Sequence, residues 1–155
     1  MVTFEAKILK RIRKFCAYQE RSQKEVRDRL AAVGVKGEDA EEIIAKLIEE
    51  GFLNEERFAK LYAGGKFRLK KWGKIKIKTR LQQKGISTYC IKKALEEIND
   101  NDYIDTLRDL IIKKIEKGGY MDKTTLKNSL YMNLLAKGYE SDLIKTTIEE
   151  CLVSV

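Results

Sequence analysis

A dense run of cations in the middle of the chain carries the clearest chemical signal. Between residues 59 and 93 the sequence holds twelve lysines and arginines and no carboxylate, a charge of +12 against a net charge of +8 for all 155 residues. Such cations repel one another unless a polyanion neutralises them, and a phosphate backbone is the polyanion that fits best. The candidate nucleic-acid-binding residues of this run are Lys66, Arg68, Lys70, Lys71, Trp72, Lys74, Lys76, Lys78 and Arg80.

Two aromatic residues lie among these cations. Phe67 and Trp72 either stack on unpaired bases or belong to the hydrophobic core, and an aromatic residue near a helix end is more often part of the core. Nothing in the run indicates recognition of particular bases. We therefore expect contacts with phosphate that do not depend on base sequence.

A smaller set of cations recurs at helical spacing near the N-terminus. The positions follow i, i+3, i+4 and i+7, which places four cations on one helix face, opposite Ile8, Ile12 and Phe15. These four additional candidate binding residues are Lys7, Lys10, Arg11 and Lys14. Such a stripe is equally typical of a helix face that is merely solvated.

The residue types that most enzymes need are missing or scattered. The chain has no histidine, which excludes Ser-His-Asp triads and histidine-bearing zinc sites. Cys16, Cys90 and Cys151 form no C-x-x-C pair, so we expect three buried free thiols. There is no glycine-rich phosphate loop, and capping or solubility explains the paired carboxylates. We expect a protein without enzymatic activity, metal or cofactor.

An internal repeat indicates the architecture. The motif Leu-x-x-x-Gly recurs at a regular distance with Gly34, Gly85 and Gly138, which lie 51 and 53 residues apart with apolar residues at matching helical offsets. The chain also lacks proline, which favours uninterrupted helices. The sequence thus predicts an all-α fold of three tandem three-helix repeats, over 1–53, 54–100 (the basic repeat) and 101–155.

Two arrangements of these repeats remain open. One is a compact globule of nine helices, and the other is an elongated array, straight or curved, in which each repeat touches only its neighbours. Short connections and the uneven distribution of charge favour the elongated array. The first ten residues include the charged Glu5 and hold no apolar run long enough for a signal peptide or a membrane span, so we expect a cytoplasmic protein with no membrane partner. We also expect a monomer.

Local signals predict where individual helices begin and end. Ser22 and Glu25 form a capping box, Gly34 is a left-handed helix cap, and Asn54, Asp122 and Ser141 are candidate N-caps.

Two segments are irregular. Residues 74–78 alternate lysine and isoleucine as a strand would, but the register of the repeat predicts helix. Gly64 and Gly65 predict a break or bend in their helix, since each glycine costs about 1 kcal/mol relative to alanine.

Two stretches of the sequence resemble a known family. Residues 51–59 (GFLNEERFA), together with Gly73, Ile77 and Leu81 and the Lys-Gly-Ile at 84–86, resemble the second repeat of the RecX family of bacterial regulatory proteins. Residues 21–30, with Arg-Ser at the start and Glu-Val four residues on, resemble the opening of its first repeat. Asn54 stands where the family usually has aspartate, which also caps a helix.

The resemblance implies a non-enzymatic negative modulator of the RecA recombinase. Such a protein would lie in the groove of the RecA–DNA filament and inhibit its ATPase, strand-exchange and co-protease activities in DNA repair and the SOS response. The cations named above would contact the filament and its single-stranded, or also double-stranded, DNA. A sequence-independent DNA-binding module without a recombinase partner, and a plain helical scaffold with incidental charge, are the alternatives.

Overall fold

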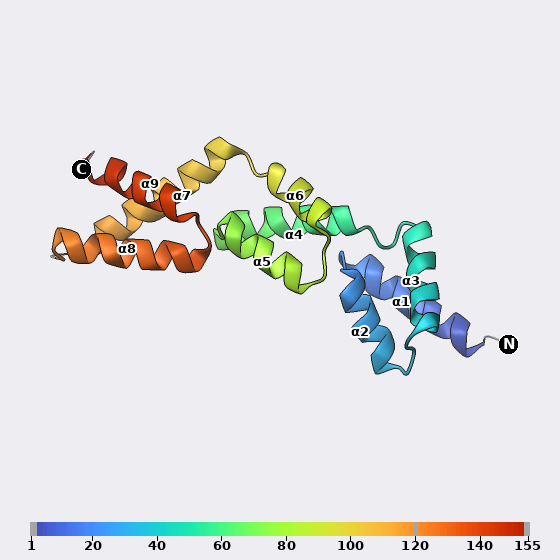
Figure 1. Ribbon diagram of the computed structural model, residues 1–155. Helices are drawn as coiled ribbons and strands as arrows, with labels where there is room; N and C mark the ends of the chain where they lie inside the picture. The colour runs from blue at the N-terminus through green and yellow to red at the C-terminus, as the bar shows by residue number, and fades with distance from the viewer. Residues whose placement is uncertain (1–2, 120, 154–155) are drawn as a thin grey trace. The chain divides into compact units, whose positions relative to one another are not determined.

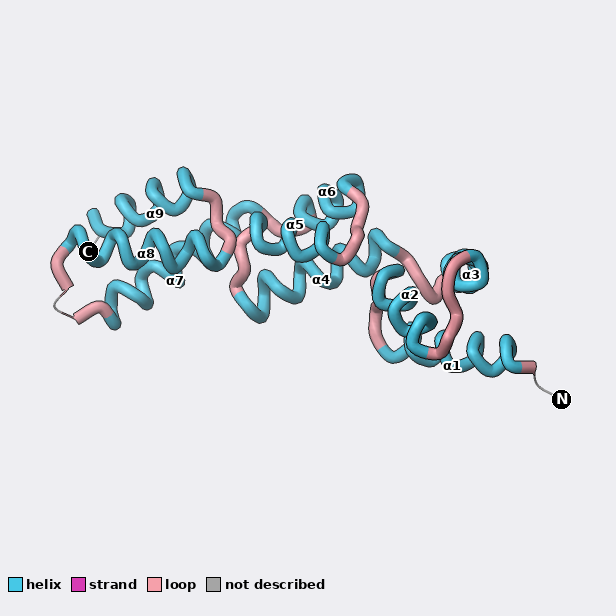
Figure 2. The backbone as a smooth tube through the Cα atoms, turned by 60° about the horizontal axis from the view of Figure 1, so that its bottom comes forward, coloured by secondary structure: helices cyan, strands magenta, loops and turns pink. Residues whose placement is uncertain are grey.

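The computed structural model describes residues 3–119 and 121–153, and these residues form helices and loops but no strand (Figures 1 and 2). This result confirms the predicted all-α fold and its organisation as an array of helical repeats. The helices are α1 (Phe4–Tyr18), α2 (Gln23–Ala32), α3 (Glu38–Glu49), α4 (Glu55–Lys70), α5 (Lys74–Gln83), α6 (Thr88–Glu96), α7 (Asp100–Lys117), α8 (Lys123–Lys137) and α9 (Ser141–Val153).

The chain divides into two compact units. Unit 1 comprises Met1–Tyr62 and Leu81–Ala94, and unit 2 comprises Ala63–Arg80 and Leu95–Val155. The division passes through α4, α5 and α6, so the basic middle repeat contributes to both units. The repeat boundaries at 53 and 100 therefore stay a prediction.

The Leu-x-x-x-Gly motif makes the same helix-ending hydrogen bond in each repeat. The residue after the glycine donates its backbone N–H to the carbonyl of the motif's leucine: Val35 to Leu30 at 2.9 Å, Ile86 to Leu81 at 3.1 Å and Tyr139 to Leu134 at 3.2 Å. The three glycines all have positive φ, between 76° and 98°, which is the conformation of a left-handed helix cap. The sequence repeat is thus a repeated C-terminal cap, as predicted for Gly34.

The core of unit 1 includes one apolar stripe from each of α1, α2 and α3. Its buried members have helical spacing because a stripe of residues three or four apart faces the same way. They include Ile8, Ile12, Cys16, Val26, Leu30, Ala40, Ile44 and Leu47. All three cysteines of the chain are buried free thiols, as expected, and burial raises the pKa of Cys16 to about 11.

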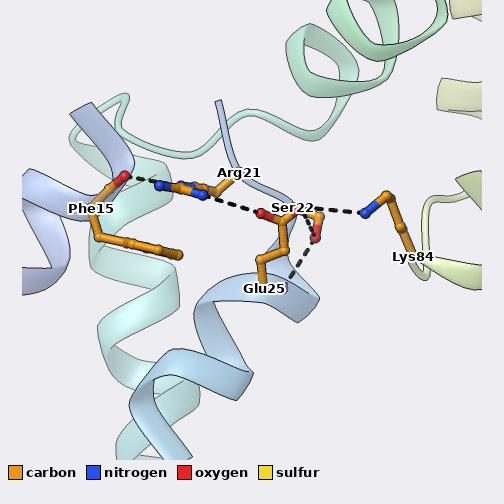
Figure 3. A network of polar contacts seen from close by, with 5 residues as sticks. All are labelled: Phe15, Arg21, Ser22, Glu25 and Lys84. Carbon is orange, nitrogen blue, oxygen red and sulfur yellow. Dashed lines mark hydrogen bonds and ion pairs between the residues drawn. The ribbon is translucent and has the colours of Figure 1, made fainter. Parts of the chain in front are cut away.

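The predicted capping box at the start of α2 is the centre of a polar network (Figure 3). Ser22 Oγ accepts the Glu25 N–H at 3.1 Å, and the two side chains also hydrogen-bond at 3.3 Å. Glu25 forms ion pairs with Arg21 at 3.8 Å and with Lys84, beyond the end of α5, at 3.7 Å. Arg21 in turn donates to the carbonyl of Phe15 in α1 at 3.1 Å. The Arg-Ser and Glu of this segment therefore tie three segments of unit 1 together.

In unit 2, α7, α8 and α9 pack against one another. Asp122 caps α8 as predicted, with its Oδ1 accepting the Thr125 N–H at 2.9 Å. The prediction for Ser141 is wrong: it is the first residue of α9, and its hydroxyl bonds to Tyr131 Oη at 2.8 Å instead of capping the helix. The first helical hydrogen bond of α9 comes from Ile144 to the Glu140 carbonyl at 2.9 Å.

The expected break at Gly64 and Gly65 is also wrong, because α4 runs unbroken through both glycines. The helix buries Ala59, Ala63 and Phe67 along one face, and that burial outweighs the roughly 1 kcal/mol that each glycine costs. Gly64 also leaves room for the side chain of Arg68, whose Nη1 would lie 2.7 Å from a Cβ at this position. Residues 74–78 are helical, as the repeat register predicted.

Along the described ranges, each helix is too short or too polar to cross a membrane.

Candidate nucleic-acid interface

The loop between α4 and α5 carries the centre of the basic run, and its backbone is constrained. Lys71 has a φ of +59°, the left-handed conformation that usually selects glycine. Its N–H donates to the Phe67 carbonyl at 3.0 Å, which closes α4 with the single hydrogen bond of an αL cap, and the N–H of Trp72 donates to the Lys66 carbonyl at 3.3 Å. Holding a lysine in this conformation costs on the order of 1 kcal/mol.

Backbone contact with the loop between α8 and α9 fixes this segment from the other side. Gly73 N–H donates to the Lys137 carbonyl at 2.8 Å, and Ile75 N–H donates to the Gly138 carbonyl at 3.0 Å. A Cβ on Gly73 would lie 2.3 Å from the carbonyl carbon of Gly138. Only glycine at position 73 permits this approach. The contact therefore explains in physical terms why a glycine stands at this position, which from the sequence alone is only part of a family resemblance.

Two buried tyrosines complete the support of the loop. Tyr139 Oη donates to the Lys71 carbonyl at 2.9 Å. Tyr103 Oη accepts the Lys74 N–H at 2.8 Å and donates to Glu140 Oε1 at 2.5 Å. Burial, followed for Tyr103 by the bond to Glu140, raises the pKa of both phenols above the ordinary value.

Sequence reasoning missed both tyrosines. A signal was present for one of them, because Tyr139 follows the motif glycine at the position where the other repeats have Val35 and Ile86. The Tyr139 ring is fully buried, and its hydroxyl reaches the α4–α5 loop. The ring of Phe67 packs at 5.8 Å from that of Tyr103, and Phe67 is buried, so it belongs to the core and not to a base-stacking surface.

Trp72 gathers cations from both flanking helices. Lys66 Nζ from α4 lies 5.0 Å from the centroid of its ring, and Lys76 Nζ and Arg80 Cζ from α5 lie 4.5 Å and 5.8 Å away. The indole is half-buried, and such contacts with its face are attractive. We call Lys66, Trp72, Lys76 and Arg80 the Trp72 cluster. The fold thus brings together four of the predicted site residues.

Four further predicted cations of this run are exposed around the cluster's helices. They are Arg68, Lys70, Lys71 and Lys78. No carboxylate within residues 3–119 and 121–153 forms an ion pair with any of them. Lys74 differs, because it is half-buried, pairs with Asp100 at 3.5 Å and lies 4.8 Å from the centre of the Tyr103 ring. Its side chain is therefore engaged within unit 2.

The predicted cations of α1 belong to unit 1, so the thirteen sequence-predicted residues fall into two sets. All four α1 side chains are exposed, and in the described part of the chain none of them pairs with a carboxylate. Lys7, Arg11 and Lys14 line a groove with α2, whereas Lys10 does not. Over residues 3–119 and 121–153, no three His, Cys, Asp or Glu side chains are grouped as metal ligands would be.

Comparison with known protein families gives two matches. The model described as RecX, first three-helix domain, matches residues 14–47, and the model described as RecX, second three-helix domain, matches residues 54–95. The second match contains every predicted site residue of the middle repeat.

Curated proteins and solved structures give the same family name. The regulatory protein RecX of Clostridium perfringens is 35% identical over 130 residues, covering 83% of this chain and 60% of the relative. That of Listeria monocytogenes serotype 4a is 29% identical over 136 residues, covering 88% and 51%. The chain spans about half the length of the first curated relatives it matches.

Two crystal structures share the fold over nearly all of the chain. RecX from Lactobacillus salivarius aligns with a TM-score of 0.87 at 27% identity, covering 96% of this chain and 97% of that structure. A second regulatory protein RecX aligns with a TM-score of 0.84 at 21% identity, covering 94% and 71%.

Proposed function

This chain belongs to the RecX family of regulatory proteins, and we propose that it acts as a non-enzymatic negative modulator of the RecA recombinase. It binds in the groove of the RecA–DNA filament and opposes the ATPase, strand-exchange and co-protease activities that serve DNA repair and the SOS response. Its own contribution is binding, through phosphate contacts made by the middle repeat.

The observation that carries this proposal is the arrangement of charge around the α4–α5 loop. The Trp72 cluster gathers three cations around one ring. Four more cations are exposed and form no ion pair with a carboxylate of the described residues: Arg68, Lys70, Lys71 and Lys78. The loop between them is held by the Gly73 backbone contact and by Tyr139. A basic surface on a fixed backbone suits a regularly spaced polyanion such as DNA inside a filament.

The direct test is ATP hydrolysis by RecA on single-stranded DNA. Adding this protein below the concentration of RecA lowers the hydrolysis rate. Reversing three exposed cations in the variant K70E/K71E/K78E weakens the inhibition because it replaces attraction to phosphate by repulsion. Lys74 is left unchanged because it pairs with Asp100. Replacing it would break that pair, and a loss of binding could then not be distinguished from a loss of stability.

A variant with the same change in net charge serves as the control. K36E/K113E/K123E reverses three exposed lysines of other segments of the chain, outside α4, α5 and the loop between them, and keeps wild-type inhibition. Unchanged hydrolysis with equimolar wild-type protein would count against the proposal. Equal loss in both variants would show that net charge, not this surface, is responsible.

A sequence-independent DNA-binding module without a recombinase partner is the second candidate. The Trp72 cluster favours it, since cations around a half-buried indole need nothing more than phosphate and bases. It predicts equal affinity for bare DNA and for RecA-coated DNA, whereas the first candidate predicts tighter binding to the coated DNA. On either account, neutralising about four to six phosphates gives a slope of log K against log salt of about −3 to −5.

A further inference from the structure

A groove between α1 and α2 in unit 1 has no role in the function proposed above. Its volume is about 830 Å³. Five cations line it, namely Lys7, Arg11, Lys14, Arg21 and Arg29, and none of the described residues that line it is a carboxylate. The groove is therefore suited to an acidic ligand.

The rest of the lining is apolar. Ile8, Ile12 and Leu30 of the buried unit 1 core form the floor of the groove, and large exposed apolar side chains lie around this floor. Phe4 is 67% exposed, Tyr18 81% and Val33 44%. Apolar side chains gathered at a groove and bordered by charge are typical of a surface that binds another macromolecule.

The chemistry of the lining favours protein over nucleic acid as the occupant. The floor is aliphatic, whereas bases stack on aromatic rings. The two exposed rings of the lining, Phe4 and Tyr18, are the first and last residues of α1, about 21 Å apart along the helix, so they form no continuous stacking surface. The ring of Phe15 is already in contact with guanidinium groups, with Arg21 Cζ 3.8 Å and Arg29 Cζ 5.0 Å from its centroid. An amphipathic helix, in contrast, places apolar side chains at i, i+3, i+4 and i+7 on such a floor and its charged face toward the rim.

We propose that the α1–α2 groove binds an acidic amphipathic helix of a partner protein. The apolar face of that helix packs on the exposed side chains of Phe4, Tyr18 and Val33, and its carboxylates pair with the cations of α1. The two basic surfaces of the chain then have different partners: phosphate at the α4–α5 loop and carboxylate at the groove.

The probe is a fluorescein-labelled peptide of about 15 residues, with leucine at i, i+3, i+4 and i+7 and glutamate between, the helix-in-groove pattern. Fluorescence anisotropy measures its binding to the full chain. A scrambled peptide of the same composition keeps the charge and loses the apolar face. We expect the amphipathic peptide to bind and the scrambled one to bind at least about tenfold more weakly, since charge alone is poorly specific.

Neighbouring residues on α1 supply a matched pair of variants. Arg11 lines the groove and Lys10 does not, although both are exposed cations on the same helix. R11E therefore weakens peptide binding by about fivefold and K7E/R11E/K14E by at least about tenfold, whereas K10E leaves it unchanged. V33D adds a carboxylate to the groove at a half-exposed position and also weakens binding. Circular dichroism checks that each variant remains helical.

Binding of a labelled thymidine oligonucleotide separates the two surfaces. We expect K7E/R11E/K14E to keep its affinity for the oligonucleotide and K70E/K71E/K78E to lose it, with the opposite pattern for the peptide. Three results would overturn the proposal. The amphipathic peptide does not bind, the scrambled peptide binds equally well, or the groove variants lose binding of the oligonucleotide but keep binding of the peptide. None of these depends on inhibition of RecA, so this proposal and the proposed function fail separately.

Discussion

Gly73 and Gly138 approach so closely that the carbonyl carbon of Gly138 occupies the space a side chain on Gly73 would need, 2.3 Å from the position of its Cβ. The two glycines belong to different predicted repeats. Two backbone hydrogen bonds join their segments, from the Gly73 N–H to the Lys137 carbonyl and from the Ile75 N–H to the Gly138 carbonyl. Within unit 2, backbone contact thus holds the α4–α5 loop, with its cations, to the α8–α9 loop.

Replacing Gly73 by alanine forces that contact apart. We expect Gly73→Ala to lower the free energy of unfolding by more than about 2 kcal/mol, because backbone atoms cannot yield as a flexible side chain does. Gly65→Ala is the control, since nothing lies within 4 Å of its Cβ and its helix gains about 0.5–1 kcal/mol from alanine. Urea denaturation measures both, and a Gly73→Ala protein as stable as the wild type would contradict the contact.

The hydroxyl of Tyr103 satisfies two polar groups at once. Tyr103→Phe leaves the Lys74 N–H and the Glu140 carboxylate without their partner, which we expect to cost about 1–3 kcal/mol. Tyr89→Phe removes a hydroxyl from a ring that is 62% exposed and has little effect. Equal stability of the two variants in urea would show that the Tyr103 bonds contribute nothing.

The folded state also keeps the phenol of Tyr139 protonated. Burial raises its pKa above the ordinary 10.0, so the unfolded chain loses this proton at a lower pH than the folded chain does. The stability that results is complete below pH 10 and declines as the pH rises toward the folded pKa, by at most about 1.4 kcal/mol per pH unit for one group.

Comparison with Tyr139→Phe isolates this contribution from the titration of lysines. Urea denaturation from pH 8 to pH 11 gives both stabilities at each pH. We expect the stability difference between wild type and variant to shrink above pH 10, because only the wild type has this proton to lose. A difference that stays constant up to pH 11 would mean that Tyr139 ionises as readily in the folded state as in the unfolded chain.

The sequence was sufficient for the elements that depend on local pattern. The Leu-x-x-x-Gly spacing, the cap at Asn54 and the helix over 74–78 all follow from residues a few positions apart, and Arg57 N–H donates to Asn54 Oδ1 at 2.8 Å as a cap requires. Gly64 and Gly65 were misjudged because the burial that holds α4 together comes from packing, which a local cost does not include.

The candidate site was only partly predictable for the same reason. Composition located the cations, but the meeting of Lys66 and Lys76 on the ring of Trp72 depends on how α4 and α5 pack. The same packing engages Lys74 with Asp100, a partner 26 residues away that charge counting could not assign. The groove of α1 with α2 was also beyond the sequence, since Arg21 and Arg29 reach it from outside the α1 stripe.

Lys71 combines an unfavourable backbone with a cation at the centre of the proposed interface. Lys71→Gly relieves the left-handed conformation, so we expect the free energy of unfolding to rise by about 1 kcal/mol. The same change removes one phosphate contact and reduces the salt slope of oligonucleotide binding by about 0.7, the value for one contact to single-stranded DNA. Lys70→Gly provides the contrast: it removes a neighbouring cation from the last turn of α4, so DNA binding falls equally while stability drops. Urea denaturation and a salt titration test both variants, and a Lys71→Gly protein that is more stable yet binds DNA as the wild type does would separate the strain from the function proposed here.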